Sequence, residues 1–245
     1  MSELYLRAEN NGERTVISDS RFTSPIKIAK PFYRNEYTEV MMMTASAGIL
    51  EGDWYDIGIN AGKDTALKFT GQSYTKIFKS ENRGASQRVD ISAEEGTKLL
   101  YMPCPVIPFG HSVFNSQTEI HLAENSRFAM CDIISCGRAA MKESFQFDLY
   151  RSRTAVYIGE KLKFLDNVRL VPSEAELSGI GFFEKHTHMG MIYVYGFDIG
   201  ELPECDGIEA AATTAEMGIC IRISAYSADE IVHFSEKVLN GFFKK

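Results

Sequence analysis

The sequence contains little that marks a membrane, exported or nucleic-acid-binding protein. Its longest apolar runs, residues 40–43 and 192–197, are far shorter than the roughly 20 residues that a membrane-spanning helix needs. Its first residues mix acidic and basic side chains and precede no apolar stretch of the kind found in signal peptides. Lys and Arg number 26 against 33 Asp and Glu, a formal net charge of -7, whereas nucleic-acid binding needs a basic surface. We therefore expect no membrane partner and no nucleic-acid partner.

Cysteine is scarce as well, with five residues that form no CxxC pair. An odd number of cysteines in a chain without an evident signal peptide indicates reduced thiols and a cytoplasmic location. No glycine-rich phosphate loop, Gly-x-Ser-x-Gly elbow or His-Glu-x-x-His helix occurs either. The sequence thus gives poor support to nucleotide hydrolysis and to serine or zinc protease chemistry, and we expect no enzymatic activity.

The composition is otherwise that of an ordinary globular protein. The 245 residues are 44% hydrophobic and 24% charged. A chain of this length buries roughly 70 to 75% of its unfolded surface, which is enough for a core without disulfides or structural metals. Because no obvious linker interrupts the chain, we expect a single domain over residues 1–245, with a β region over residues 1–170 and a tail over residues 171–245.

Apolar and polar residues alternate between residues 55 and 134, with short polar turns between the alternating segments, a pattern typical of β-strands. Three segments there resemble one another at offsets of 32 and 31 residues, the kind of period that stacked units produce. We interpret them as stacked antiparallel hairpins in a mainly β fold, like a β-helix or a sandwich. Regular hairpins in any all-β protein are the alternative. The matching positions are Ile57, Ile59 and Leu67, then Val89, Ile91 and Leu99, then Ile120, Leu122 and Met130.

Beyond Pro172 the pattern changes, and two helices are predicted in this C-terminal part. The final one is the clearer, because Ser227 and Glu230 have capping-box spacing before an apolar stripe. The tail is expected to run as a strand at 191–197, a helix at 204–214, a strand at 219–225 and the final helix. Earlier strands are expected at 15–18, 40–44, 145–158 and 162–170, the last two as a hairpin.

His186 and His188 are the first candidates for a metal site. Two imidazoles that are two residues apart on a strand project to the same face. The spacing resembles the metal motif of cupins, but Ile192 and Tyr193 stand where that motif needs a Glu. A cupin-like metalloenzyme that uses these histidines is therefore the alternative function, and a structural or surface role for the pair is favoured.

Asp132 is the most unusual acidic residue, because Cys131 and Ile133 flank it within a longer apolar segment. A buried carboxylate must be neutralised, paired or hydrated. Two interpretations follow from this requirement. Asp132 either forms a salt bridge with Arg138 or another base, or it lines a polar path inside the protein.

Six stretches in consistent order resemble the urease accessory protein D family, which is called H in some bacteria. They extend over about residues 14 to 170, and each one alone is weakly specific. The stretches are Pro31-Phe32-Tyr33; Ala47-Gly48-Ile49-Leu50-Glu51-Gly52-Asp53; Thr70-x-x-Ser73-Tyr74-Thr75-Lys76-Ile77-Phe78-Lys79-Ser80; Pro103-x-Pro105-x-Ile107-Pro108-Phe109; Cys136-Gly137-Arg138-x-x-x-x-Glu143-x-Phe145; and Leu165-Asp166-x-x-Arg169-Leu170.

The resemblance implies a scaffold that is not an enzyme. Such proteins are mostly β with two helices, bind urease accessory proteins F and G, and dock on apo-urease so that nickel can be inserted. A dimer of such heterocomplexes is also compatible with it. The resemblance further implies an internal water-filled path for Ni²⁺ in transit, with no tightly bound cofactor.

Nickel in transit must be held weakly, because a full set of imidazole and thiolate ligands would trap it. Sparse carboxylates with retained water would let it move. Asp53, Asp132, Glu143 and Asp166 are therefore the candidates for the nickel path. A carbohydrate-binding β module is a further, less favoured class, because Trp54 is the only Trp available for stacking.

Overall fold

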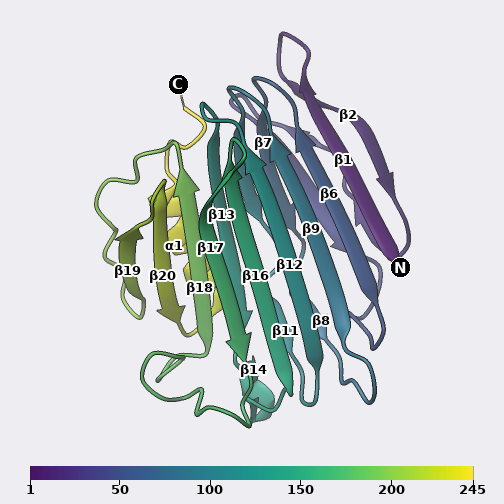
Figure 1. The fold of residues 1–245 in the computed structure, drawn as a ribbon, viewed down its shortest axis with the longest axis vertical. Helices are drawn as coiled ribbons and strands as arrows, with labels where there is room; N and C mark the ends of the chain where they lie inside the picture. Colours follow the sequence, from purple (N-terminus) through teal and green to yellow (C-terminus); the bar gives the residue numbers. More distant parts are fainter. Residues whose placement is uncertain (245) are drawn as a thin grey trace.

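Two β-sheets lie face to face in the computed structural model, which describes residues 1–244 (Figure 1). Sheet A has seven strands and sheet B has eleven, three of which branch from its main path. Sheet A runs in the order β17 (Lys161–Leu170), β16 (Leu149–Ile158), β12 (Val113–Leu122), β9 (Ala85–Ala93), β6 (Trp54–Ala61), β1 (Ser2–Asn10) and β2 (Thr15–Phe22).

Along the chain, most strands of sheet A are followed by a strand of sheet B. Its main path is β19 (Glu209–Thr214), β20 (Ile219–Ala225), β18 (His188–Tyr195), β13 (Arg127–Ser135), β10 (Lys98–Met102), β7 (Ala66–Gly71), β5 (Thr38–Thr44) and β3 (Ile26–Ile28). The branching strands are β4 (Phe32–Tyr33), β8 (Thr75–Ile77) and β11 (Val106–Pro108). A separate small pair, β14 (Gly137–Arg138) and β15 (Glu143–Ser144), encloses the 3₁₀ turn η1 (Ala139–Met141).

The repeated segments form stacked coils, each of which passes from sheet A to sheet B. β6, β9 and β12 pair in parallel in sheet A, and β7, β10 and β13 pair in parallel in sheet B. The prediction of a mainly β, stacked fold is confirmed, and the architecture is like a β-solenoid. The predicted antiparallel hairpin pairing of the units is wrong, because each unit hydrogen-bonds to the equivalent strands of the next coil.

The predicted offset between the second and third repeats also needs correction. Ile59 pairs with Ile91 and Ile91 pairs with Ile120, so the offsets are 32 and 29 residues. Leu122 pairs with Ala93 instead. The predicted partner of Ile91, Leu122, is two residues along the strand from the observed partner, Ile120. Because strand side chains alternate between the two faces, Leu122 is buried on the same face as Ile120.

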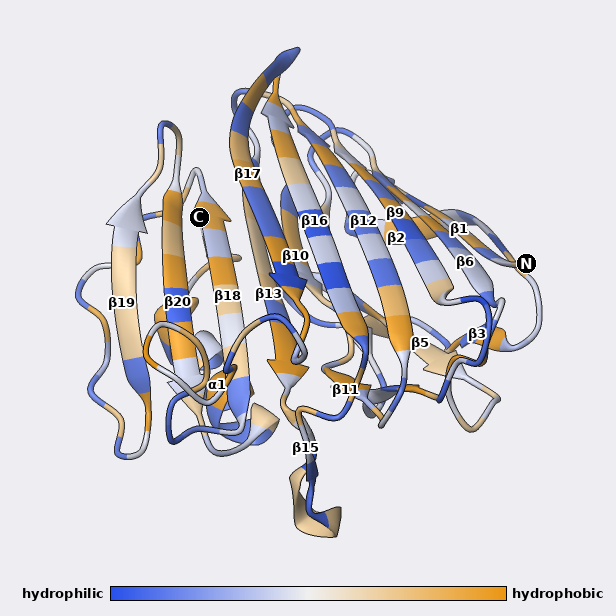
Figure 2. Ribbon diagram, turned by 60° about the horizontal axis from the view of Figure 1, so that its bottom comes forward, coloured by the Kyte–Doolittle hydropathy of each residue, from blue (hydrophilic) through white to orange (hydrophobic). Residues whose placement is uncertain are grey.

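Strand alternation places one side of each sheet in the core. Figure 2 shows hydrophobic and hydrophilic bands alternating along β9, β12 and β16. The inward positions include Val89, Ile91 and Ile120, which are at most 1% exposed. The predicted hairpin of β16 and β17 is confirmed, with Ile158 paired to Lys161.

The tail extends sheet B with β18, β20 and β19, which are antiparallel to their neighbours. The predicted helix at 204–214 is wrong, because residues 209–214 form β19. This segment pairs with β20 along its whole length, for example Ala212 with Ile221. As a helix it would leave the edge of β20 without hydrogen-bond partners, and Thr213 and Thr214 favour the strand.

The predicted final helix is confirmed as α1 (Ala228–Val238), which packs on the outer face of sheet B over β13, β18 and β20. Gly190 of β18 allows this close approach, because a Cβ there would lie 2.8 Å from Cγ2 of Ile231. The predicted capping box is present: Ser227 Oγ accepts from the Glu230 N–H, and the Glu230 carboxylate accepts from the Ser227 N–H. Neither α1 nor another helical segment within residues 1–244 has the length and apolar character to cross a bilayer.

Replacing Ser227 with Ala should lower the free energy of unfolding by about 1 kcal/mol, because the Glu230 N–H loses its acceptor. Urea denaturation followed by circular dichroism would measure the change. Ser227→Asp is the matched control, since Asp also caps helices and should restore most of the loss. Equal stability of the Ala variant and the parent would show that the cap contributes nothing.

Candidate functional site

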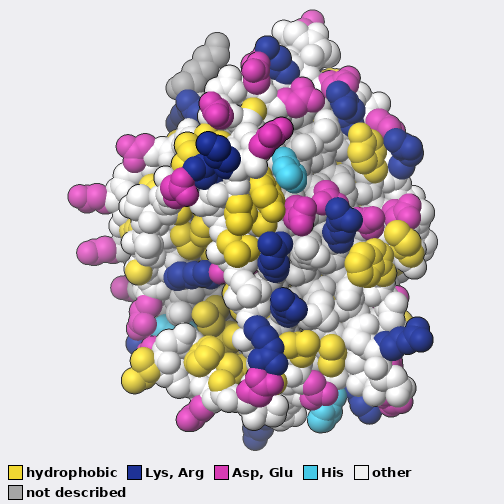
Figure 3. All heavy atoms as spheres, in the orientation of Figure 1, with side chains coloured by type: hydrophobic (Ala, Val, Ile, Leu, Met, Phe, Trp, Pro, Cys, Tyr) yellow, Lys and Arg dark blue, Asp and Glu magenta, His cyan; other side chains and the backbone are white. Residues whose placement is uncertain are grey.

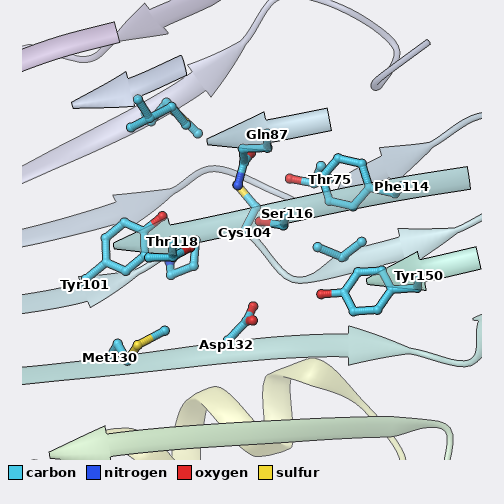
Figure 4. Close-up of a pocket in the computed structure, with 14 residues that line it drawn as sticks. Thr75, Gln87, Tyr101, Cys104, Phe114, Ser116, Thr118, Met130, Asp132 and Tyr150 are labelled. Atoms are coloured by element: carbon cyan, nitrogen blue, oxygen red, sulfur yellow. The ribbon is translucent and has the colours of Figure 1, made fainter. Parts of the chain in front are cut away.

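A cavity of about 40 Å³ lies between the two sheets, and residues of both sheets line it. Thr118 of β12 and Tyr150 of β16 belong to sheet A, whereas Tyr101 of β10 and Asp132 of β13 belong to sheet B. Figure 4 shows the Asp132 carboxylate directed into the space between these strands. The volume is enough for ordered water, and the lining offers the polar partners that buried water needs.

The cavity forms where the inner face of sheet A changes from apolar to polar. One row of paired inward positions consists of Tyr55, Gln87, Ser116 and Ser152 on four adjacent strands. The side chains of Gln87, Ser116 and Ser152 are small or polar and leave unfilled a space that aliphatic side chains fill in other rows, such as Ile59, Ile91 and Ile120. The sequence reasoning did not identify these residues. Their signal was a polar residue at an inward register position, such as Gln87 two residues before Val89.

Strand alternation explains why Asp132 faces the cavity. Cys131 and Ile133 point outward and pack beneath α1, so the residue between them points inward. Burial, and after it the negative charge of Asp166, raises the pKa of Asp132 from its ordinary value of 3.8 to about 6. The Ile133 N–H, the Ser152 hydroxyl and the Arg222 charge act in the opposite direction. Asp132 is only half-buried, because its carboxylate faces the cavity.

Asp166 lies close to Asp132, so two of the four predicted path residues are brought together. Asp166 sits on β17 of sheet A and hydrogen-bonds Arg222 on β20 of sheet B, with 3.2 Å between Oδ2 and Nη1. The Asp166 side chain is 14% exposed and that of Arg222 is 49% exposed. This partly exposed ion pair therefore joins the two sheets.

The predicted alternative partner of Asp132 is engaged elsewhere. Arg138 forms an ion pair with Glu143 and lies 4.1 Å from the centroid of the Phe109 ring. The hydrogen bonds from Arg138 lower the pKa of Glu143, which also accepts from the Gly110 N–H at 2.8 Å. The interpretation of Asp132 as a partner of Arg138 is wrong, and the basic residue near it is Arg222.

Asp53 and Glu143 do not line the cavity around Asp132. Asp53 precedes β6 and accepts from the Leu50 N–H at 2.8 Å across a turn. Glu143 lies on the small β14–β15 pair. Both carboxylates thus have local structural partners within residues 1–244, and their part in a nickel path stays a prediction.

A second cavity of about 340 Å³ adjoins the first and is bordered by the loops around residues 46–49 and 73–76. Met42, Thr75 and Gln87 line both cavities, so the two spaces are separated by little more than these side chains. Tyr55 also lines the second cavity, and its buried hydroxyl has no hydrogen-bond partner within residues 1–244. An unpaired buried hydroxyl next to a cavity indicates a place for water.

The two histidines are placed differently from each other. His186 precedes β18, is 4% exposed and contacts the Tyr226 ring at a centroid distance of 4.9 Å. His188 begins β18, where its Nδ1 lies 2.9 Å from Thr187 Oγ1 and burial lowers its pKa. Among residues 1–244 no group of three or more His, Cys, Asp or Glu side chains could hold a metal ion. The pair therefore lacks the third ligand that the cupin-like alternative needs.

Comparison with known proteins decides the family. The family model described as UreD urease accessory protein matches residues 1–242. The chain belongs to the UreD urease accessory protein family. It is 36% identical to the urease accessory protein UreD of Acetivibrio thermocellus, over 98% of this chain and 96% of that protein. It is also 31% identical to the urease accessory protein UreH of Helicobacter hepaticus, over 91% of this chain and 90% of that protein.

A third relative is the urease accessory protein UreH of Helicobacter pylori strain HPAG1, which is 30% identical over 97% of this chain and 93% of that protein. The predicted resemblance is thus confirmed, and it extends beyond the motifs at residues 14–170 to nearly the whole chain. This UreD-family chain acts in urease maturation. Its membership favours an accessory role over the cupin-like alternative.

The Asp132→Asn variant should be more stable than the parent at pH 7, by up to about 3 kcal/mol. The folded-state pKa of Asp132 is raised, so the folded protein binds this proton more strongly than the unfolded chain does. The stability of the parent relative to the variant should therefore fall as the pH rises from about 4 to about 6, and the two proteins should converge near pH 4. Urea denaturation at a series of pH values would measure this.

Asp166→Asn is the matched control, because it removes a carboxylate that pairs with Arg222 and should not increase stability. An Asp132→Asn variant that is less stable than the parent at pH 7 would contradict the expectation. That result would mean that the ionised carboxylate of Asp132 has a strong structural partner in the folded state.

Proposed function

We propose that this chain is a non-catalytic scaffold that binds urease accessory proteins F and G and apo-urease, and that it routes Ni²⁺ through its interior toward the urease metallocentre. The observation that carries the proposal is the cavity between the sheets, with the Asp132 carboxylate directed into it. A carboxylate held among apolar strands at a cost in stability needs a reason other than folding. Attraction of a passing cation supplies one.

The cavity chemistry suits transit better than storage of nickel. Asp132 is the one carboxylate among the cavity residues, and the other oxygen atoms come from hydroxyl groups and from Gln87. Cys104 also lines the cavity, and burial raises the pKa of its thiol, which keeps the thiol protonated at neutral pH. A protonated thiol is a poor metal ligand. Ni²⁺ would therefore keep much of its water and remain mobile.

The proposed route has two possible ends in the structure. One is the second cavity, which shares Gln87 with the first and is bordered by loops 46–49 and 73–76. The other is the junction of β17 and β20, where Asp166 follows Asp132 toward solvent. The ion pair of Asp166 with Arg222 would close that end, and its opening would expose a second carboxylate to the ion.

The proposed partners are those that the resemblance to the family implies. A scaffold of this kind acts through its surfaces. Accessory proteins F and G would deliver the ion to one end of the route, and apo-urease would receive it at the other. A symmetric pair of such complexes, bound as a dimer of heterocomplexes, is consistent with this arrangement.

Asp132→Asn should leave complex assembly intact and reduce urease activation, because the variant keeps the size of the side chain and removes its charge. The variant would be co-expressed with accessory proteins F and G and apo-urease. Co-purification measures assembly, and the nickel content and specific activity of urease measure delivery. Nickel content should fall by about tenfold if the charge supplies a modest attraction.

Asp19→Asn is the matched control, since Asp19 lies on the edge strand β2, does not line the cavity, and its loss should change neither readout. Normal nickel content with a normally assembled Asp132→Asn complex would remove Asp132 from the route. Failure of the parent chain to co-purify with accessory protein F would contradict the scaffold role itself.

A further inference from the structure

The outer face of sheet A carries an uncovered group of basic side chains. The α-helix of the described chain packs on sheet B, so this face of sheet A is open (Figure 1). Figure 3 shows the same face in space-filling form, with Lys and Arg side chains gathered near its middle. Arg151 and Arg153 point outward here, because they alternate with the buried Tyr150 and Ser152 along β16.

The strand register extends this group across five strands, of which β6, β9, β12 and β16 are parallel and β17 is antiparallel to β16. One row of paired outward positions consists of Trp54, Ser86, Asn115, Arg151 and Arg169. The next row consists of Asp56, Arg88, Gln117, Arg153 and Asn167. With strands about 4.8 Å apart, the distance from Trp54 to Arg151 along the row is about 14 Å.

Two of the arginines in these rows have no partner within the described chain. Arg88 pairs with Asp90, and Arg169 pairs with Glu174. Arg151 and Arg153, by contrast, form no ion pair and no side-chain hydrogen bond with any of residues 1–244. In a chain with a formal net charge of -7, two adjacent guanidinium groups without a carboxylate partner are unusual.

These arginines line a groove of about 220 Å³, with Trp54 at its other side. Ser86, Asn115 and Gln117 lie between them and present hydrogen-bonding side chains along the groove. Trp54 is 41% exposed although it is a large apolar residue. Exposed Trp and Arg side chains are the residues most enriched at the centres of protein interfaces.

We propose that this groove binds a carboxylate-rich segment of a partner protein, with Arg151 and Arg153 pairing with its carboxylates and Trp54 packing on its backbone or apolar side chains. The guanidinium fork matches the geometry of a carboxylate and can form two hydrogen bonds with it. The length of the groove suits a few extended residues. The inference is independent of the nickel route, which lies between the sheets and not on this face.

A nucleic acid fits this face less well than an acidic peptide. Glu119 lies on β12 beside β16, and Asp90 on β9 and Asp56 on β6 lie two and three strands from the arginines. A long polyanion that crosses these strands would be repelled by the three carboxylates. The carboxylates of a short acidic segment bound at Arg151 and Arg153 stay two or more strands from Asp90 and Asp56.

The single Trp of the sequence makes the proposal directly testable. The full-length protein would be titrated, without nickel, with an oligo-glutamate peptide while Trp54 emission is recorded. Binding should change the emission, weaken as NaCl is added, and be absent with an oligo-glutamine peptide of the same length. In Arg151→Gln/Arg153→Gln the affinity should fall by about tenfold or more.

Arg7→Gln/Arg21→Gln is the matched control, because it removes two charges from strands at the far edge of the same sheet and should leave the affinity unchanged. Gln117→Lys adds a charge beside Arg153 and should strengthen binding. Equal affinity of the Arg151→Gln/Arg153→Gln protein and the parent would overturn the proposal, as would the absence of peptide binding. Tighter binding of a single-stranded oligonucleotide than of the peptide would overturn it in favour of a nucleic-acid surface.

Discussion

Hydrogen bonds between equivalent strands of successive coils hold the two sheets in a fixed register, and the internal cavity depends on that register. Each coil adds one strand to each sheet, so side chains at equivalent positions form rows across the inner faces. Aliphatic rows fill the space between the sheets. The row that contains Gln87 and Ser116 does not fill it, because its side chains are small or polar. A cavity in this fold is thus a property of a whole row.

The electrostatics of the cavity follow from the same geometry. β13 brings Asp132 inward from sheet B, and β17 brings Asp166 inward from sheet A, so two carboxylates approach each other between the sheets. Arg222 pairs with Asp166 at the solvent side and leaves Asp132 without an ion-pair partner within residues 1–244. The charge that faces the cavity is therefore only partly balanced. A divalent cation with its water would be attracted to such a place and held weakly.

The inner and outer faces of sheet A carry different kinds of side chain. Along β16 the residues alternate between Ser152, which borders the polar interior, and Arg151 and Arg153, which face solvent. A single strand therefore contributes to the proposed internal route and to the proposed external binding groove at once. α1 covers the corresponding part of sheet B, where apolar residues such as Ile133 and Ile192 would otherwise be exposed. No helix of residues 1–244 covers the groove on sheet A, and most of the side chains that line it are polar or charged.

The sequence by itself determined the family, the mainly β architecture, the β16–β17 hairpin and the final capped helix, because each depends on local alternation, local capping or ordered motifs. It also placed Asp132 in an apolar setting. The tertiary structure alone decided the parallel pairing, the 29-residue offset of the third repeat and the strand at β19. Parallel and antiparallel strands share the same alternation, so the pattern cannot distinguish them. The pairing of Asp166 with Arg222, the polar row through Gln87 and the groove at Arg151 also arise only when distant segments meet, since nothing in the spacing along the chain encodes which residues become neighbours across a sheet.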